Sequence, residues 1–160
     1  MPFCPANGPA EARKNGIDAE WILPIRKAEL DHFRFIALHS SSALEEEGKK
    51  MHHCIATYTD RCRSSSLRAF SVRHQETDKR IATLTVFYSL RSHSWQIDQI
   101  HGPSNTEVND RVVESSLGLL HCLDDATRTD VELQRAMSKL GRVQVFERQP
   151  FHDGIRCIPF

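Results

Sequence analysis

Three segments rich in β-branched and aromatic residues follow one another in the middle of the chain. They comprise residues 68–73, 80–88 and 94–100. The second segment is the strongest strand candidate. The polar connections between them, 75–79 and 90–93, are too short to hold a crossover helix. Strands joined by such short links pair antiparallel, so this part of the chain predicts an antiparallel meander.

Helical patterns lie on both sides of this meander. Before it, Ser42 predicts an N-cap and Glu45 completes a capping box, and the pattern resumes after Gly48 to about residue 62. After it, Ser104 predicts a second N-cap. A third, shorter helical pattern begins at residue 131 and is expected to end at Gly141.

Two further strands are expected outside the meander, over 32–38 and 142–146. Together the elements predict an α+β fold, in which a small, mostly antiparallel sheet of about three to five strands is packed by two or three helices on one face. We expect a single domain over 21–160. Residues 1–20 hold three prolines and two glycines and predict a poorly ordered lead-in.

The composition is that of a soluble globular protein. The 160 residues carry no net charge, and 39% of them are hydrophobic. No apolar run approaches eighteen residues and no signal-peptide pattern opens the chain, so we expect a cytoplasmic protein without membrane contact. Five scattered cysteines are then most simply free thiols. Neither a cofactor nor a metal is predicted.

The segment 51–62 concentrates reactive side chains, with two imidazoles, two thiols and a phenol. Read as a helix, it also carries an apolar stripe at helical spacing, formed by Met51, Cys54, Ile55, Tyr58 and Cys62. The stripe is typical of a buried helix face, whereas the side chains suit a reactive cluster. The spacing lacks the short ligand pairs of a zinc site. Both interpretations remain open from the sequence.

The order of motifs resembles the PcfJ-like proteins, which are encoded by conjugative plasmids, phages and related mobile elements. Residues 44–58 match the family's "EG, M-x-HC, three residues, Tyr" signature. Further matches follow at Phe70–Arg73, Ala82–Leu84 and Gln99–Asn105, so the resemblance covers about residues 40–106. Family members often place Glu after the A-T-L triplet, where this chain has Thr85. The family has no settled activity, so the resemblance implies a genomic setting rather than a reaction.

Four residues are candidates for catalysis: His53, Cys54, Tyr58 and His101. A thiol becomes nucleophilic when a neighbouring imidazolium or a helix N-terminus lowers its pKa. Adjacent residues of one helix diverge by about 100°, so His53 is a poor general base for Cys54. His101 is the best candidate for a base from elsewhere in the chain. A buried, inert Cys54 is the competing interpretation.

Seven residues are candidates for binding: Arg61, Arg63, Arg68, Arg73, Gln99, Gly102 and Asn105. The segment 60–91 carries seven basic residues against three acidic ones and predicts a basic patch. Arg73 and Gln99 end two strands and could lie close together, where Arg73 could hold a phosphate or a carboxylate. The turn 102–105 could bind an anion if it enters a helix, or it could be an ordinary turn.

Three functions are compatible with these residues. The first is an accessory binding module of a mobile element, with nucleic acid or a protein of a conjugation or phage system as partner. The second is a small enzyme with a pocket of six residues: His53, Cys54, Tyr58, Arg73, Gln99 and Asn105. The third is a protein–protein interaction domain that docks through its helices. The sequence does not predict an oligomeric state.

Overall fold

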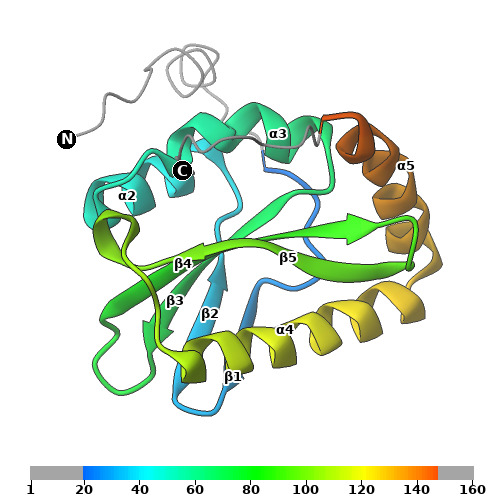
Figure 1. The fold of residues 1–160 in the computed structure, drawn as a ribbon. Coiled ribbons are helices and arrows are strands. Elements are labelled where there is room, and N and C mark those ends of the chain that lie inside the picture. The colour runs from blue at the N-terminus through cyan, green and yellow to red at the C-terminus, as the bar shows by residue number, and fades with distance from the viewer. Residues whose placement is uncertain (1–19, 148–160) are drawn as a thin grey trace.

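A five-stranded antiparallel sheet forms the centre of the protein (Figure 1). The computed structural model describes the backbone of residues 20–147 and the side chains of residues 20–141. The strands are β1 (Lys27–Leu30), β2 (Phe33–Ala37), β3 (Arg68–His74), β4 (Arg80–Ser89) and β5 (Ser94–His101). They are ordered in space as in the sequence, and each pairs antiparallel with the next. The predicted α+β fold and meander are confirmed, with β1 as an additional edge strand.

Helices cover both faces of this sheet. The helical elements are α2 (Ser41–Met51), η1 (Ile55–Tyr58), α3 (Thr59–Ser64), η2 (Pro103–Asn105), α4 (Asp110–Thr129) and α5 (Val131–Glu147). Figure 1 shows α2 and α3 on one side of the sheet and α4 on the other. The sequence analysis placed the helices on one face. The arrangement differs because alternate residues of β3 and β4 are buried on both sides.

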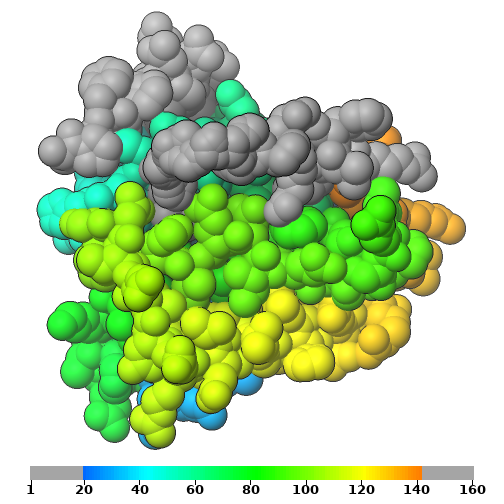
Figure 2. Space-filling model, in the orientation of Figure 1, coloured from blue at the N-terminus to red at the C-terminus, as the bar shows by residue number. Residues whose placement is uncertain are grey.

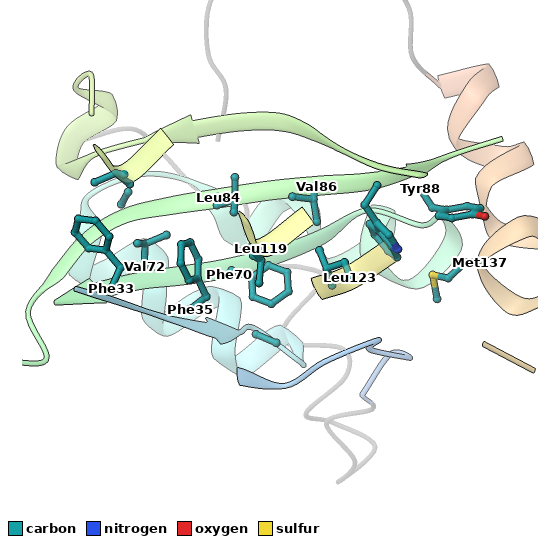
Figure 3. Close-up of a cluster of buried hydrophobic side chains, with 14 of the residues drawn as sticks. Phe33, Phe35, Phe70, Val72, Leu84, Val86, Tyr88, Leu119, Leu123 and Met137 are labelled. Atoms are coloured by element: carbon teal, nitrogen blue, oxygen red, sulfur yellow. The ribbon is translucent and has the colours of Figure 1, made fainter. Parts of the chain in front are cut away.

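The larger core lies between the sheet and the helices α4 and α5. Figure 3 shows the phenylalanines of β2 and β3 beside Leu119 and Leu123 of α4, with Met137 of α5 near Tyr88. At one end of this core the Trp95 ring nitrogen donates to Thr127 at 2.9 Å. On the space-filling surface, β5 and α4 form adjacent bands of one face (Figure 2).

A smaller core lies on the opposite face of the sheet. Its buried members are Trp21, Leu38, Leu44, Ile55, Tyr58, Cys62, Leu67 and Ala69. Every residue of the predicted stripe, from Met51 to Cys62, is therefore buried, with at most 9% exposure. Between these apolar residues and the edge strand β5, the same face also buries Ser71, Thr83 and Thr85 completely.

The predicted continuous helix through residue 62 is wrong, because the chain leaves it at His52. This residue adopts the left-handed conformation with φ 57°, and the next residue, His53, donates its backbone N–H to the Gly48 carbonyl at 3.1 Å. The chain then continues as the 3₁₀ turn η1 and the short helix α3. The N-cap is Ser40 rather than Ser42, since the Ser40 hydroxyl accepts from the Ala43 N–H.

Two other predicted boundaries are wrong. Helix α4 begins after the N-cap Asn109, whose side chain accepts from the Arg111 N–H at 2.7 Å, so Ser104 is not a helix cap. The backbone of 142–146 continues helix α5 and is not a strand, which places Gly141 inside that helix. The predicted lead-in of residues 1–19 lies outside the described residues.

A side chain at position 48 would create a steric conflict. A Cβ atom at this position would lie 2.7 Å from the His53 carbonyl oxygen, closer than van der Waals contact permits. Alanine normally stabilises a helix relative to glycine, but here we expect Gly48→Ala to lower the free energy of unfolding by about 1–3 kcal/mol. Urea denaturation measures this change.

The matched control is Gly118→Ala in helix α4. Its Cβ would meet only the end of the Leu30 side chain, at 3.6 Å, so we expect stabilisation of about 0.5–1 kcal/mol. If both substitutions stabilise the protein equally, the close packing of Gly48 against His53 is wrong.

Candidate functional site

A chain of buried polar groups joins helix α2 to strand β4. The Glu47 side chain is fully buried, and one of its oxygens accepts from the Arg80 Nε at 2.8 Å. Its other oxygen accepts from the Thr83 hydroxyl at 2.7 Å. The same hydroxyl oxygen lies 3.0 Å from Nε2 of His53, which is 2% exposed. Four residues from two separate segments thus form one connected chain.

These hydrogen bonds determine which ring nitrogen of His53 carries a hydrogen. A threonine hydroxyl has one proton, and here it is donated to Glu47, so the hydroxyl oxygen accepts from His53 and Nε2 carries a hydrogen. Burial, with smaller contributions from the nearby imidazoles of His101 and His52, lowers the pKa of His53 to about 4. At neutral pH, His53 is therefore an uncharged imidazole with a defined tautomer.

Local backbone geometry brings His53 to this position. The left-handed turn at His52 reverses the chain, and Gly48 lets the His53 carbonyl approach helix α2 closely. Glu47, one residue earlier, then points to the same place on β4. The spacing of Glu47, Gly48 and His53 is thereby explained by packing: each residue is needed to bring α2 and the following turn to Thr83.

A second polar cluster, the β5 cluster, adjoins the first and consists of Tyr58, Arg61, Asp98, Gln99 and His101. Its members come from η1, α3 and β5. The Arg61 guanidinium lies over the Tyr58 ring, 4.7 Å from its centroid. Arg61 and Gln99 lie near the Tyr58 hydroxyl, and burial raises the pKa of this phenol. The phenol is therefore protonated at neutral pH.

The sheet register places the β5 cluster beside His53. His101 pairs with Thr83 across the two strands, and Gln99 pairs with Thr85. Burial lowers the pKa of His101, which favours its uncharged form. Thr85, where family relatives often have Glu, donates to the Asp98 carboxylate at 3.1 Å. A carboxylate thus lies next to this position, although it belongs to the neighbouring strand.

One atom of the β5 cluster is unsatisfied. Oε1 of Gln99 is buried and finds no hydrogen-bond donor among the residues that the structure describes. The same side chain lies near the Tyr58 hydroxyl. A buried acceptor without a donor is rare in folded proteins and indicates a place where a water molecule or a ligand can bind.

Cys62 and Cys122 are free thiols, and Cys54 is buried. Burial raises the pKa of Cys62 to about 12, which leaves it protonated and unreactive at neutral pH.

The candidate arginines fall into three different environments. Arg68 is fully buried, and its guanidinium donates to the backbone carbonyls of Ile22, Cys62, Ser65 and Leu67. Burial lowers the pKa of Arg68 to about 10, so it stays charged at neutral pH and supports the fold from inside. Arg61 is half-buried in the β5 cluster, and Arg63 is exposed on the same short helix.

The remaining candidate residues make other contacts. Arg73 is on β3, where it contacts Ser71 and Asp78, and its cross-strand partner is Arg80 rather than Gln99. Asn105 is exposed in η2 with φ 61°. Gly102 directly follows His101, but its turn does not enter helix α4, which begins at residue 110. The condition for anion binding at a helix start is therefore not met.

The sequence analysis missed Glu47, Thr83, Arg80 and Asp98. Glu47 carried a signal, since it precedes Gly48 in the motif that resembles the family. Thr83 lies in the matched A-T-L triplet and was treated as a strand residue. Only the packing of α2 on β4 shows that these two side chains meet.

The described residues contain no group of three or more His, Cys, Asp or Glu side chains that could hold a metal ion. Within the same part of the chain, no helix combines the length and the apolar character needed to cross a membrane.

The low pKa of His53 predicts a specific loss of stability in acid. The unfolded chain binds a proton at His53 near pH 6.5, but the folded protein does so only near pH 4. The free energy of unfolding therefore decreases as the pH falls through this interval, by up to about 1.4 kcal/mol per pH unit from this residue alone. Urea denaturation between pH 7 and pH 4.5 measures the slope.

We expect His53→Gln to remove this component, so that the variant loses less stability per pH unit than the wild type. The control variant His121→Gln changes an exposed imidazole on α4, and it should keep the slope of the wild type. Identical slopes for the wild type and His53→Gln would contradict the burial of an uncharged His53.

Comparison with known protein families supports the resemblance seen in the sequence motifs. The family model of PcfJ-like proteins matches residues 12–114, a span that contains both polar clusters and all five strands. No curated protein and no solved structure shows significant similarity to the chain. The match extends over more than half of the sequence, and the chain belongs to the PcfJ-like protein family.

Proposed function

We propose that this PcfJ-like protein is a binding module that contacts single-stranded nucleic acid through the β5 cluster and Arg63. The observation that carries the proposal is the Arg61 guanidinium stacked on Tyr58, beside the unsatisfied Oε1 of Gln99. Proteins recognise unstacked bases with these features, because bases stack on guanidinium and aromatic planes and hydrogen-bond through their edges.

Each side chain has a distinct expected contact. The Oε1 of Gln99 can accept a hydrogen bond from a base amino group, which would satisfy this buried atom. Arg61 offers both a planar face and donors for a phosphate. Arg63 is exposed on the same helix and supplies a second positive charge. The combination suits a ligand that has a base and a phosphate close together.

The net charge of zero limits this proposal to a local interaction. No long-range field draws nucleic acid to the protein, so binding depends on a few contacts and should be modest at physiological salt. The setting expected from the family resemblance, a conjugative plasmid or a phage, makes nucleic acid or a protein of the same system the expected partner. A cytoplasmic location remains a prediction.

The two alternatives receive less support. An enzyme with the predicted six-residue pocket would need Arg73 and Asn105 near His53, but Arg73 pairs with Asp78 and Asn105 lies in an exposed turn. An interaction domain would need an apolar docking surface. Among the described residues, the exposed large hydrophobic side chains are on separate elements: Ile22, Leu117 and Val131. Both alternatives remain predictions.

Fluorescence anisotropy with a labelled single-stranded oligonucleotide tests the proposal. We expect the double substitution Arg61→Ala/Arg63→Ala to weaken binding about tenfold at low salt, because two phosphate contacts are lost. The slope of log K against log salt should become shallower by about 1.4. Circular dichroism checks that the variant is folded.

The matched control is Arg111→Ala/Arg135→Ala, which removes the same charge from exposed positions on α4 and α5. It should bind as the wild type does. The proposal fails if the wild type shows no salt-dependent binding, or if the two double variants lose equal affinity.

A further inference from the structure

Three arginines lie side by side on adjacent strands of the sheet. Arg34 of β2 pairs directly with Arg73 of β3, and Arg73 lies opposite Arg80 of β4 at a shift in the strand register. Directly paired residues point to the same face of a sheet and lie about 4.5–5.5 Å apart at Cβ. Like charges so close repel each other and destabilise the sheet. An arrangement with this cost requires negative charge to compensate it.

One exposed carboxylate bridges two of these guanidinium groups. Asp78 contacts Nη1 of Arg34 with one oxygen at 3.1 Å and Nη1 of Arg73 with the other at 3.2 Å. The Asp78 side chain is 56% exposed, whereas the two arginine side chains are 25% and 17% exposed. The guanidinium groups are thus held in the sheet, and their common counter-charge lies at the surface.

Asp78 is in the connection between β3 and β4, where its φ of 58° is left-handed. This conformation is uncommon for a residue other than glycine. The carboxylate is therefore on a turn, while its partners are on paired strands. A movement of this turn would expose Arg34 and Arg73 without disturbing the sheet.

The other acidic groups near this row contact Arg34 or Arg80 instead of Arg73. Glu29 contacts Nε of Arg34 at 3.2 Å, and the buried Glu47 contacts Nε of Arg80 at 2.8 Å. Glu46 lies 3.9 Å from Arg80. Arg73 differs, because among the residues that the structure describes it contacts only the Ser71 hydroxyl besides Asp78. If Asp78 leaves, Arg73 loses its ion pair and the row gains a free positive charge.

We propose that Arg34 and Arg73, flanked by Arg80, form a phosphate-binding site that Asp78 occupies in the structure described here. Two oxygens of a phosphate group can bridge two guanidinium groups as the carboxylate of Asp78 does. Binding exchanges the internal carboxylate for the phosphate, so Asp78 competes with the ligand. The site shares no residue with the β5 cluster, and the proposal does not rest on nucleic-acid binding there.

Titration with inorganic phosphate at constant ionic strength tests this site in the full chain. The arginine Nε–H resonances, observed by NMR, report which guanidinium groups the ligand contacts. We expect Asp78→Asn to lower the Kd for phosphate about tenfold relative to the wild type, because the competing charge is removed. The resonances of Arg34 and Arg73 should shift together.

A matched control frees a single arginine instead of a pair. Asp125→Asn removes the partner of Arg128 on α4, another exposed ion pair, and it should leave the Kd of the wild type unchanged. In the Asp78→Asn background, Arg73→Gln or Arg34→Gln should abolish the gain. Either of these two variants is sufficient for the test if the other does not fold.

Titrations with two further ligands, acetate and a nucleoside monophosphate, identify the ligand chemistry. Acetate should bind Asp78→Asn more weakly than phosphate does, and equal binding would contradict a phosphate site. A nucleoside monophosphate with the same Kd as inorganic phosphate indicates recognition of the phosphate group alone, whereas a lower Kd indicates a phosphate ester as the ligand. The proposal is overturned if Asp78→Asn and Asp125→Asn bind phosphate equally.

Discussion

The hydrogen bonds of the buried Glu47 carboxylate position both His53 and the row of arginines on the sheet. A carboxylate without partners is very costly to bury, but Glu47 accepts from Thr83 and pairs with Arg80 at hydrogen-bond distance. Both partners are on β4, so the position of α2 over the sheet is defined by these bonds. The Thr83 contact then orients His53, and the Arg80 contact holds one end of the arginine row.

These contacts explain why residues of the PcfJ-like motif stand where they do. Gly48 is required where the His53 carbonyl packs against α2, and Glu47 supplies the bond to the sheet. Tyr58 belongs to the smaller core through its ring and to the β5 cluster through its hydroxyl. Packing and polar contacts are therefore made by the same short segment.

Much of the fold could be predicted because it rests on local patterns. The three central strands were identified from β-branched and aromatic residues and short links, and the burial of the apolar stripe followed from its helical spacing; its residues are Met51, Cys54, Ile55, Tyr58 and Cys62. The break at His52 was missed, because histidine, although more frequent there than most residues, adopts the left-handed conformation only occasionally. The cap at Ser40 was missed because Ser40, Ser41 and Ser42 are chemically identical candidates.

The site was predicted less completely, because its key contacts join residues distant in the sequence. His53, Tyr58, Gln99 and His101 were identified, and the sheet register brings them near one another. Thr83 is 36 residues from Glu47, and no local pattern indicates that they meet. Arg68 was expected in a surface patch, but four backbone carbonyls hold it inside the protein.

The coupling between Glu47 and Thr83 tests the central claim most directly. A double-mutant cycle with Glu47→Met, Thr83→Val and the combined variant, followed by urea denaturation, isolates the free energy of their interaction. We expect a coupling of at least about 1.5 kcal/mol, because the hydrogen bond is buried and involves a charged acceptor. Effects that add to within about 0.5 kcal/mol would contradict a structure in which Glu47 fixes α2 and His53 on the sheet.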